Sequence, residues 1–392
     1  MIFFSTIPSA AAYERKQHLY ETMHARYNDI KKSDNFVRYN ELKTYVQSPE
    51  FTSELNHIRS LSYKTSKEHL LVKRLKEVRR YPEVKKFKKT GEHTAEAYVQ
   101  EYISLQNKIT SPSFRQHKAY LKNKNRHKNS EPYLKLLEFR RLAKSKYIRE
   151  FFKIQKRYAA VFEERARWKV TFQDVFHHER LSAQWDTKPY WSEAMSAESY
   201  SFNAEEHFLS DGKNLAFSGD ALQIIVRKET VAGTAWDEKN GFVTREFPYT
   251  SGMISTAHRF QMANGRLETK LSVPDIKNIY CACWLGSEKG TPAISIAHYC
   301  NNRLSMGAYA AGHTASTVKK LTLHRGQCYI FQLERTEKTL VWRLNGKKMF
   351  ECANSIHQPL YIAFTAGVLG KTSDEKLPAA FEIDYVKLSV EK

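Results

Sequence analysis

Apolar side chains recur at intervals of three and four residues through the first 170 positions of the chain. Tyr39, Leu42 and Tyr45 form one such series, and Leu71 and Leu75 belong to another. This spacing is typical of amphipathic helices, which bury one face and expose the other. Glycine, which weakens helices, occurs once between residues 13 and 168. The pattern therefore predicts a largely helical first half.

A weak repeat lies within this helical half. Residues 39–51 and 102–114 share the order Tyr, Leu, Ser-Pro-x-Phe at an offset of 63 positions. Serine favours the N-cap of a helix and proline its first turn, so Ser-Pro marks a helix start. Similar marks predict about seven to nine short helices, which need neighbours because isolated short helices are marginal. We expect a helical repeat array over residues 13–170, preceded by a tail over residues 1–12, and a longer last helix over residues 146–170.

From residue 171 onward the pattern changes to short runs in which apolar and polar residues alternate. Such alternation is typical of strands with one buried face. Asn345-Gly346 separates two of these runs and predicts a tight hairpin turn. Many short strands in one segment predict a two-sheet antiparallel β-sandwich over residues 171–392. The fold class is thus multi-domain α + β, an all-α repeat array followed by a jelly-roll sandwich. The predicted strands include residues 222–227, 266–272, 279–285, 293–299, 328–333, 339–344, 360–365 and 381–390.

Several motifs of the second half occur in the order found in one enzyme family. They include Ser251-Gly-Met-Ile254, Asn264-Gly-Arg266-Leu-Glu268, Cys283-Trp-Leu285 and Leu340-Val-Trp342 with its Asn-Gly turn. Residues 171–392 resemble the concanavalin A-like jelly roll of family 16 glycoside hydrolases. The resemblance implies a concave face that holds a sugar chain.

The strand expected to carry catalysis has no carboxylate. The resemblance implies the pattern Glu-x-Asp-x-Glu or Glu-x-Asp-x-x-Glu, in which the first Glu is the nucleophile and the last is the acid/base. Retaining hydrolysis requires two such carboxyl groups beside the scissile bond. The matching positions here are Ala293, Ser295 and either Ala297 or His298. From this strand alone we predict that the chain is not an enzyme.

A protein can keep a sugar-binding face after its catalytic groups are lost. Trp236 and Trp284 are candidates for stacking on a sugar ring, and Arg266, Ser295 and His298 are candidate polar contacts. Each also has a structural interpretation as a packing residue of the sandwich. No metal or cofactor is predicted, because a single Asp384 without an acidic cluster is a weak calcium signal.

Positive charge is concentrated in the helical half. Residues 1–170 contain 38 Lys and Arg against 18 Asp and Glu, whereas residues 171–392 contain 25 against 24. A patch of this density favours binding of nucleic acid or another anionic polymer, an acidic protein surface, or simply solvation. The candidate basic patch consists of Lys73, Arg74, Lys76, Arg79, Arg80, Lys85, Lys86, Lys88, Lys89, Lys118, Lys122, Lys124, Arg126 and Lys128.

The sequence contains no signal of export or membrane insertion. The N-terminus lacks a positive region before a short apolar run, and no segment reaches the about 18–20 apolar residues of a membrane span. The five cysteines are odd in number and lack zinc-site spacing, which favours free thiols. We expect a cytoplasmic protein, or part of an assembly exported without a cleaved signal peptide.

These observations leave three functions open. The first is a structural or interaction protein with a protein partner or self-assembly. The second is a carbohydrate-binding protein that uses the concave face of the sandwich. The third is binding of nucleic acid or another anionic polymer by the basic helices. The sequence favours the first, with the second close behind.

Overall fold

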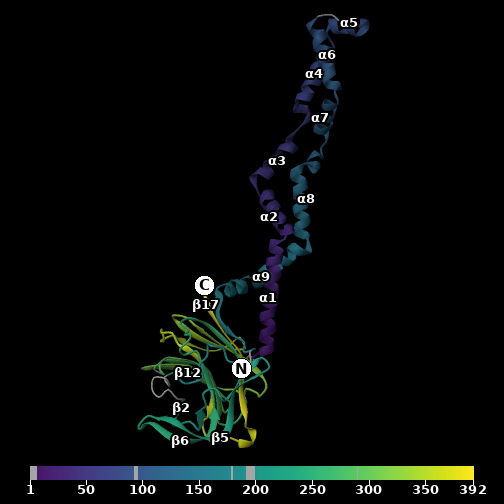
Figure 1. The fold of residues 1–392 in the computed structure, drawn as a ribbon. Coiled ribbons are helices and arrows are strands. Elements are labelled where there is room, and N and C mark those ends of the chain that lie inside the picture. The colour runs from purple at the N-terminus through teal and green to yellow at the C-terminus, as the bar shows by residue number, and fades with distance from the viewer. Residues whose placement is uncertain (1–6, 92–95, 178–179, 191–198, 289) are drawn as a thin grey trace, which may run out of the picture. The chain divides into compact units, whose positions relative to one another are not determined.

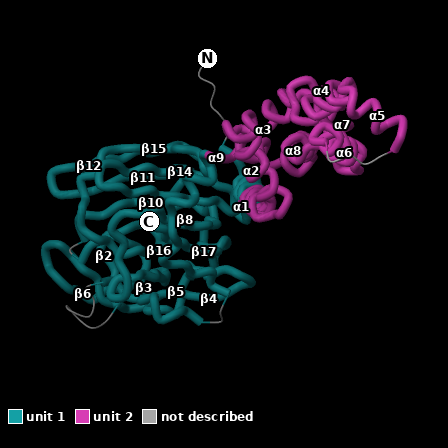
Figure 2. The backbone as a smooth tube through the Cα atoms, turned by 90° about the horizontal axis from the view of Figure 1, so that it is seen from above, with its two compact units in different colours: residues 1–20, 160–392 teal, residues 21–159 magenta. Residues whose placement is uncertain are grey.

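The computed structural model describes residues 7–91, 96–177, 180–190, 199–288 and 290–392. The chain forms two compact units, one of residues 1–20 and 160–392 and the other of residues 21–159 (Figure 2). We call them the sandwich unit and the helical unit. The predicted boundaries at residues 12 and 170 stay predictions, and residues 1–6 of the predicted tail lie outside the described residues.

Nine α-helices lie within the described residues, and two of them, α1 and α9, contribute to both units (Figure 1). The predicted all-α first half is confirmed. None of the described helices is both long and apolar enough to cross a membrane. The helices are α1 Ala10–Lys32, α2 Asp34–Val46, α3 Pro49–Ser60, α4 Lys67–Val78, α5 Pro82–Thr90, α6 Ala97–Thr110, α7 Pro112–Lys122, α8 Glu131–Lys144 and α9 Lys146–Ala166, with short 3₁₀ turns η1 Tyr63–Thr65 and η2 Arg126–Asn129.

Serine caps explain where many of these helices begin. The side-chain oxygens of Ser48 and Ser111 accept hydrogen bonds from the backbone N–H groups three residues later, at 3.2 and 3.3 Å. Proline follows each serine as the first helical residue. The phenylalanines of the two motifs, Phe51 and Phe114, are buried. The predicted Ser-Pro-x-Phe signal therefore marks helix starts as expected.

The helical unit is an antiparallel hairpin of two helix rows. Helix α2 packs on α8, α3 on η2 and α8, η1 on α7, and α4 on α6, while α5 lies beside α6 at the turn. Bidentate ion pairs between Arg38 and Glu138 and between Arg74 and Glu101 join the two rows. Each helix thus gains a partner from the opposite row, as short helices require.

The sandwich unit contains the predicted antiparallel β-sandwich, which confirms the fold class. One sheet has the order β15-β14-β13-β8-β17-β5-β6-β3, with β1, β2 and β4 attached to it, and the other has the order β12-β11-β10-β9-β16-β7. The strands are β1 Trp168–Asp174, β2 Tyr200–Phe202, β3 His207–Leu209, β4 Leu215–Ser218, β5 Ala221–Asp237, β6 Gly241–Ser251, β7 Met253–Ser255, β8 Gly265–Ser272, β9 Ile279–Gly286, β10 Ala293–Cys300, β11 Arg303–Ala310, β12 His313–Lys320, β13 Cys328–Arg335, β14 Thr339–Leu344, β15 Lys347–Ala353, β16 Tyr361–Val368 and β17 Ala379–Glu391.

The two sheets enclose one apolar core. It includes Leu222, Leu267, Leu285 and Phe364, all fully buried. The cysteines are free, and Cys281 and Cys283 lie two apart on β9, both in this core. The expected hairpin at Asn345-Gly346 joins β14 to β15.

The start of α1 is fixed to the larger sheet. The Tyr13 hydroxyl donates to the buried Glu268 carboxylate at 2.9 Å and accepts from the Gln332 amide at 2.7 Å. Lys387 completes the shell of Glu268 with its ammonium at 2.9 Å. The attraction of these groups offsets the cost of burying the carboxylate. Residues before Tyr20 therefore form part of the sandwich unit.

Candidate functional site in the sandwich

A pocket of about 570 Å³ lies against the outer face of the smaller sheet. Strands β7, β9, β10, β11 and β16 supply its floor, and β2, β3 and the loop between them supply a wall. The described residues that line it are Pro189, Tyr190, Tyr200, Phe202, Glu205, Leu209, Met253, Tyr280, Ala282, Trp284, Ala293, Ser295, His298, Ser305, Tyr309, Tyr361, Thr365 and Leu369.

A β-bulge on β10 determines which of its side chains face the pocket. The pairing of β10 with β9 and β11 shifts register after Ser295. Ile296 and Ala297 both point into the core, so that Ser295 and His298 lie on the pocket side. The indole N–H of Trp342, from the other sheet, donates to the Ser295 carbonyl at 2.9 Å. The bulge therefore selects His298 over Ala297 as the third pocket-facing position of this strand.

Aromatic side chains form much of the pocket. The rings of Tyr190 and Tyr361 are parallel at 5.5 Å between centroids, and Trp284 meets Tyr361 edge to face at 5.6 Å. Trp284 is partly exposed, whereas Tyr361 is almost fully buried. Such ring faces can pack against the apolar face of a sugar ring.

A carboxylate enters the pocket from outside the β10 strand. Glu205, on the loop between β2 and β3, accepts a hydrogen bond from the Tyr280 hydroxyl at 2.8 Å. Its other oxygen lies 3.9 Å from Nε2 of the buried His207. Burial and the charge of Glu205 together raise the pKa of Tyr280, so the phenol stays protonated and donates to the carboxylate.

His298 is a second group of the pocket that can exchange a proton. Its ring stacks on Tyr280 with centroids 5.3 Å apart and planes inclined by 17°. Burial lowers its pKa, since a partly desolvated imidazole holds a proton less well. Glu205 and His298 therefore both contact Tyr280, one through its hydroxyl and one through its ring.

The pocket carries little charge. Among the described residues that line it, Glu205 is the only carboxylate, and none is Lys or Arg. Glu288, on the turn after β9, hydrogen-bonds Tyr190, and together with burial it raises the pKa of Tyr190 to about 12. The two carboxylates that contact described lining residues in this way, Glu205 and Glu288, both bond tyrosine hydroxyls.

Two of the predicted sugar-binding residues lie elsewhere. Trp236, on β5, packs edge to face on Phe242 at 4.9 Å and does not line the pocket. Arg266, on β8 of the larger sheet, pairs with Glu164 and Glu334 at 2.7 and 2.8 Å. Its ion pairs and its contact with the Trp168 ring explain its position. Trp284, Ser295 and His298 do lie together in the pocket, whereas Trp236 and Arg266 do not.

Sequence reasoning missed Glu205, Tyr280 and Tyr361. Glu205 lies between two strands of three residues each, which are too short to produce a clear alternation. Tyr280 lies on a predicted strand at an even spacing from Trp284, and this spacing was a usable signal for a residue on the same face.

The predicted basic patch is mostly exposed, and one of its residues is buried. Most of its lysines are exposed on α4, α5, α7 and η2. Arg126, however, is buried, and its guanidinium donates to the backbone carbonyls of Ile58, Arg59 and Leu121. Its inclusion in the surface patch was wrong, because these carbonyls at helix ends need donors and Arg126 supplies them.

The comparisons with known proteins match a little over half of the chain. No family model matches the chain. It is 21% identical over 243 residues to the endo-1,3-1,4-beta-glycanase ExsH of Rhizobium meliloti, covering 57% of this chain and 52% of ExsH. It is also 21% identical over 235 residues to the endo-1,3-1,4-beta-glycanase EglC of the same organism. The chain spans about half the length of the curated relatives it matches.

Two solved structures that are similar to part of the chain are a laminarinase and a glucanase. The laminarinase catalytic domain of Thermotoga maritima is 19% identical, with a TM-score of 0.48, and the match covers 57% of this chain and 99% of that domain. SCLam, a non-specific endo-beta-1,3(4)-glucanase from family GH16, is 17% identical, with a TM-score of 0.49, and the match covers 58% of this chain and 92% of SCLam.

These comparisons correct one prediction and confirm another. The prediction that the chain is not an enzyme is wrong, because both curated relatives are named as glycanases. The sequence argument rested on the β10 positions, and Glu288 in the preceding turn did not match the pattern. A carboxylate from a more distant element, Glu205, lines the same pocket. The predicted resemblance to glycoside hydrolases is confirmed, because both curated relatives are endo-1,3-1,4-beta-glycanases.

Proposed function

We propose that the sandwich unit binds a neutral β-linked glucan in the pocket on its smaller sheet. The observation that supports this best is the partly exposed Trp284 beside the Tyr361 and Tyr190 rings. Each pyranose ring has an apolar face of C–H groups that packs on aromatic rings, while hydroxyl groups seek polar partners. Ser295, whose Oγ is buried without a hydrogen-bond partner in the described protein, is one such polar group.

The charge of the pocket supports a neutral ligand. A uronic or sulfated polysaccharide needs cationic partners for its acidic groups. The described lining has none, and its carboxylate, Glu205, repels an anionic chain. The names of the curated relatives, endo-1,3-1,4-beta-glycanases, support a β-glucan as the class of ligand.

Two tryptophan variants test the binding proposal. Trp284→Ala removes the stacking ring, and we expect glucan affinity to fall about tenfold or more. Trp236→Ala removes an equal ring outside the pocket and serves as the matched control. Calorimetric titration of the full chain with a mixed-linkage 1,3-1,4-β-glucan oligosaccharide measures both. No heat of binding from the folded wild type, or equal losses in the two variants, contradicts the proposal.

Hydrolysis of the bound glucan is the second candidate function, favoured by Glu205 in the pocket and by the activity in the relatives' names. In this reaction water attacks the anomeric carbon and gives its proton to Glu205. The glycosidic C–O bond breaks, and protonated His298 supplies the proton that the leaving oxygen takes. This assignment makes Glu205 the general base and His298 the general acid.

Neighbouring glutamates provide the test of hydrolysis. Glu205→Gln keeps the size of the side chain but removes its basicity, and we expect release of reducing ends from β-glucan to fall about 100-fold or more. Glu206→Gln is the control, because Glu206 pairs with Arg245 at 3.6 Å and does not line the pocket. Since the pKa of His298 is lowered and its acid form is required, wild-type activity is expected to rise as pH falls from 7 to 5. Equal activity of the two variants would rule out this role for Glu205.

A protein-interaction function stays a prediction from the sequence. In this proposal the pocket of the sandwich unit binds a carbohydrate. The pocket is not evidence for assembly. A pulldown with the full chain measures assembly directly.

A further inference from the structure

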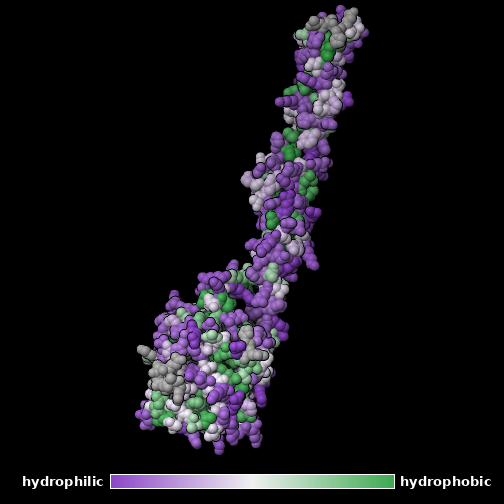
Figure 3. All heavy atoms as spheres, viewed as in Figure 1, coloured by the Kyte–Doolittle hydropathy of each residue, from purple (hydrophilic) through white to green (hydrophobic). Residues whose placement is uncertain are grey.

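Cationic side chains gather where the two rows of the helical unit turn. Residues 67–90 contain ten Lys and Arg against three Glu. Eight of them define what we call the cationic tip, formed by the C-terminal half of α4, the turn after it, and α5. These residues are Lys73, Lys76, Arg79, Arg80, Lys85, Lys86, Lys88 and Lys89, and all are exposed. Figure 3 shows that hydrophilic residues dominate the visible surface of this unit.

The tip is a folded surface. Val84 of α5 is fully buried beside Val78 and Val99, and Phe87 packs against the same cluster. Gly91 ends α5 in the left-handed conformation, with φ of 72°. With Val84 and Phe87 facing inward, the four lysines of α5 are held outward on a defined backbone.

Among the described residues, carboxylates pair with few of the cations of the tip. Within the part of the chain that the structure describes, Lys76, Arg80 and the four α5 lysines form no ion pair. Glu77 lies 3.7 Å from Arg74, whose guanidinium also binds Glu101. Glu83, on α5, is only partly exposed. Lys76, Arg80 and the four α5 lysines are therefore available to an external anion, whereas Arg79 bonds the Gln106 side chain at 3.1 Å.

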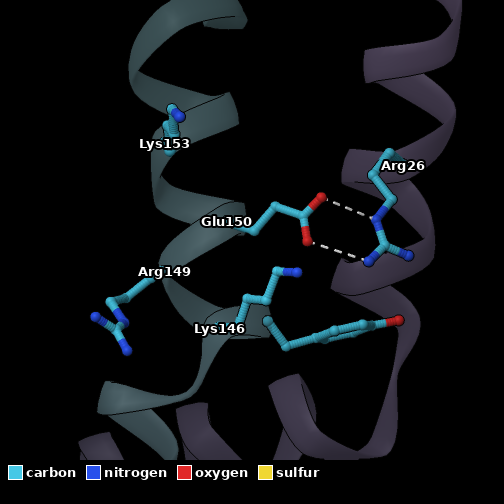
Figure 4. A pocket seen from close by; sticks show the side chains of 6 residues that line it. Arg26, Lys146, Arg149, Glu150 and Lys153 are labelled. Carbon is cyan, nitrogen blue, oxygen red and sulfur yellow. Dashed lines mark hydrogen bonds and ion pairs between the residues drawn. The ribbon is translucent and has the colours of Figure 1, made fainter.

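A second basic region of the same unit differs in this respect. An open hollow between α1 and α9 is lined by Arg26, Lys146, Arg149, Lys153 and Glu150 (Figure 4). There Glu150 binds Arg26 through two hydrogen bonds of 3.1 Å, and Asp29 contacts the same guanidinium at 3.0 Å. Internal carboxylates thus neutralise part of this region, which makes it a natural comparison for the tip.

An exposed aromatic ring accompanies the cations of the tip. Tyr98, at the start of α6, is 42% exposed and stacks on Tyr81 at 4.4 Å between centroids. Lysines act as point charges that hold phosphates without reading sequence, and an exposed ring on a rigid neighbour can stack with an unpaired base. We propose that the cationic tip binds single-stranded nucleic acid through its phosphodiester backbone, without sequence preference.

Lysine variants of equal charge change test this proposal. The tip variant replaces four lysines by glutamine, K85Q/K86Q/K88Q/K89Q. The control variant removes the same charge from α8 and α9, K144Q/K146Q/K153Q/K156Q, where the lysines are also exposed. Fluorescence anisotropy of a labelled 20-nucleotide oligothymidylate measures the affinity of the full chain between 50 and 300 mM NaCl. Circular dichroism checks that each variant keeps its helices.

The expected result is specific to the tip. We expect the tip variant to lose about tenfold or more in affinity at 100 mM NaCl and its salt slope to fall by about 2 to 3, since each phosphate contact contributes about 0.7. The control should keep the wild-type slope. Tyr98→Ala should weaken binding of the oligonucleotide but not of dextran sulfate, which has no bases. Equal losses in the two lysine variants, or no binding of the oligonucleotide at 50 mM NaCl, would overturn the proposal. Binding of dextran sulfate and anionic vesicles as tight as that of the oligonucleotide would overturn it too.

Discussion

At the scale of single residues, His207 couples the stability of the sandwich to pH. The side chain is fully buried, its Nδ1 accepts a hydrogen bond from the Val368 N–H at 3.1 Å, and Nε2 has no hydrogen-bond partner within the described chain. The groups that face it are the Glu205 carboxylate and the Tyr280 ring. Burial lowers the pKa of His207, and the charge of Glu205 opposes this shift only partly.

A histidine with a lowered pKa makes the folded state less stable in acid. Above the unfolded pKa of about 6.5 both states are neutral, and the folded state keeps its full stability. As pH falls below that value, the unfolded state binds a proton that the folded state rejects. We expect the free energy of unfolding to fall by up to about 1.4 kcal/mol per pH unit for this histidine. His207→Asn, which keeps an acceptor near the Val368 N–H, should reduce this pH dependence.

Guanidinium unfolding at pH 7.5, 6.5 and 5.5 measures the effect. All six tryptophans of the chain are at residue 168 or later, so their fluorescence reports on the sandwich unit. A loss of stability with acid that is the same in His207→Asn and in the wild type would contradict this assignment.

The candidate site was only partly predictable at this scale. Trp284 and Ser295 lie on stretches of strand that alternate between core and pocket, whereas His298 faces the pocket only because of the bulge after Ser295. Arg266 also lies on a regular strand, but alternation does not reveal which of two outer faces a residue occupies. Glu205 came from a loop, where no periodicity indicates direction.

At the scale of elements, the docking of α1 depends on the Tyr13 hydroxyl. Burial and the charge of Glu268 raise the pKa of Tyr13, so the hydroxyl stays a donor throughout the neutral range. Tyr13→Phe leaves the Glu268 carboxylate with one donor fewer in a buried position. We expect a loss of about 1–3 kcal/mol in the free energy of unfolding of the sandwich unit.

The matched control is Tyr45→Phe, which removes another Tyr–Glu hydrogen bond at an exposed place in the helical unit. It should change stability by less than about 0.5 kcal/mol. Guanidinium unfolding compares the two variants, followed by tryptophan fluorescence for the sandwich unit and by circular dichroism for the helices. A Tyr13→Phe protein as stable as the wild type would show that this contact does not hold α1 in place.

Helix starts and strand identities were predictable, whereas irregular geometry was not. Ser48 and Ser111 mark helices because capping is a local interaction. The bulge after Ser295 adds one residue to a strand without any change in composition, so the choice between Ala297 and His298 stayed open until the pairing of β9, β10 and β11 was known.

At the scale of the whole molecule, composition predicted the division into helices and strands but not the pairing of the helices. Helix α2 packs on α8, and Arg38 meets Glu138 at a separation of 100 residues. The sequence contains short helices with similar apolar faces, and nothing local distinguishes a stack of neighbours from a hairpin of two rows. Long-range ion pairs such as Arg38–Glu138 accompany this pairing, and they become visible only once the rows are in register.

The docking of Tyr13 also orders events during protein synthesis. Its partner Gln332 follows it by 319 residues. A ribosome that adds about 5–20 residues per second needs about 15–65 s to make that stretch. During this interval the first turns of α1 lack the sheet on which they dock. The whole helical unit, residues 21–159, is translated before that sheet is complete. The sandwich unit can therefore be completed only late in translation, after the opportunity for the helical unit to fold.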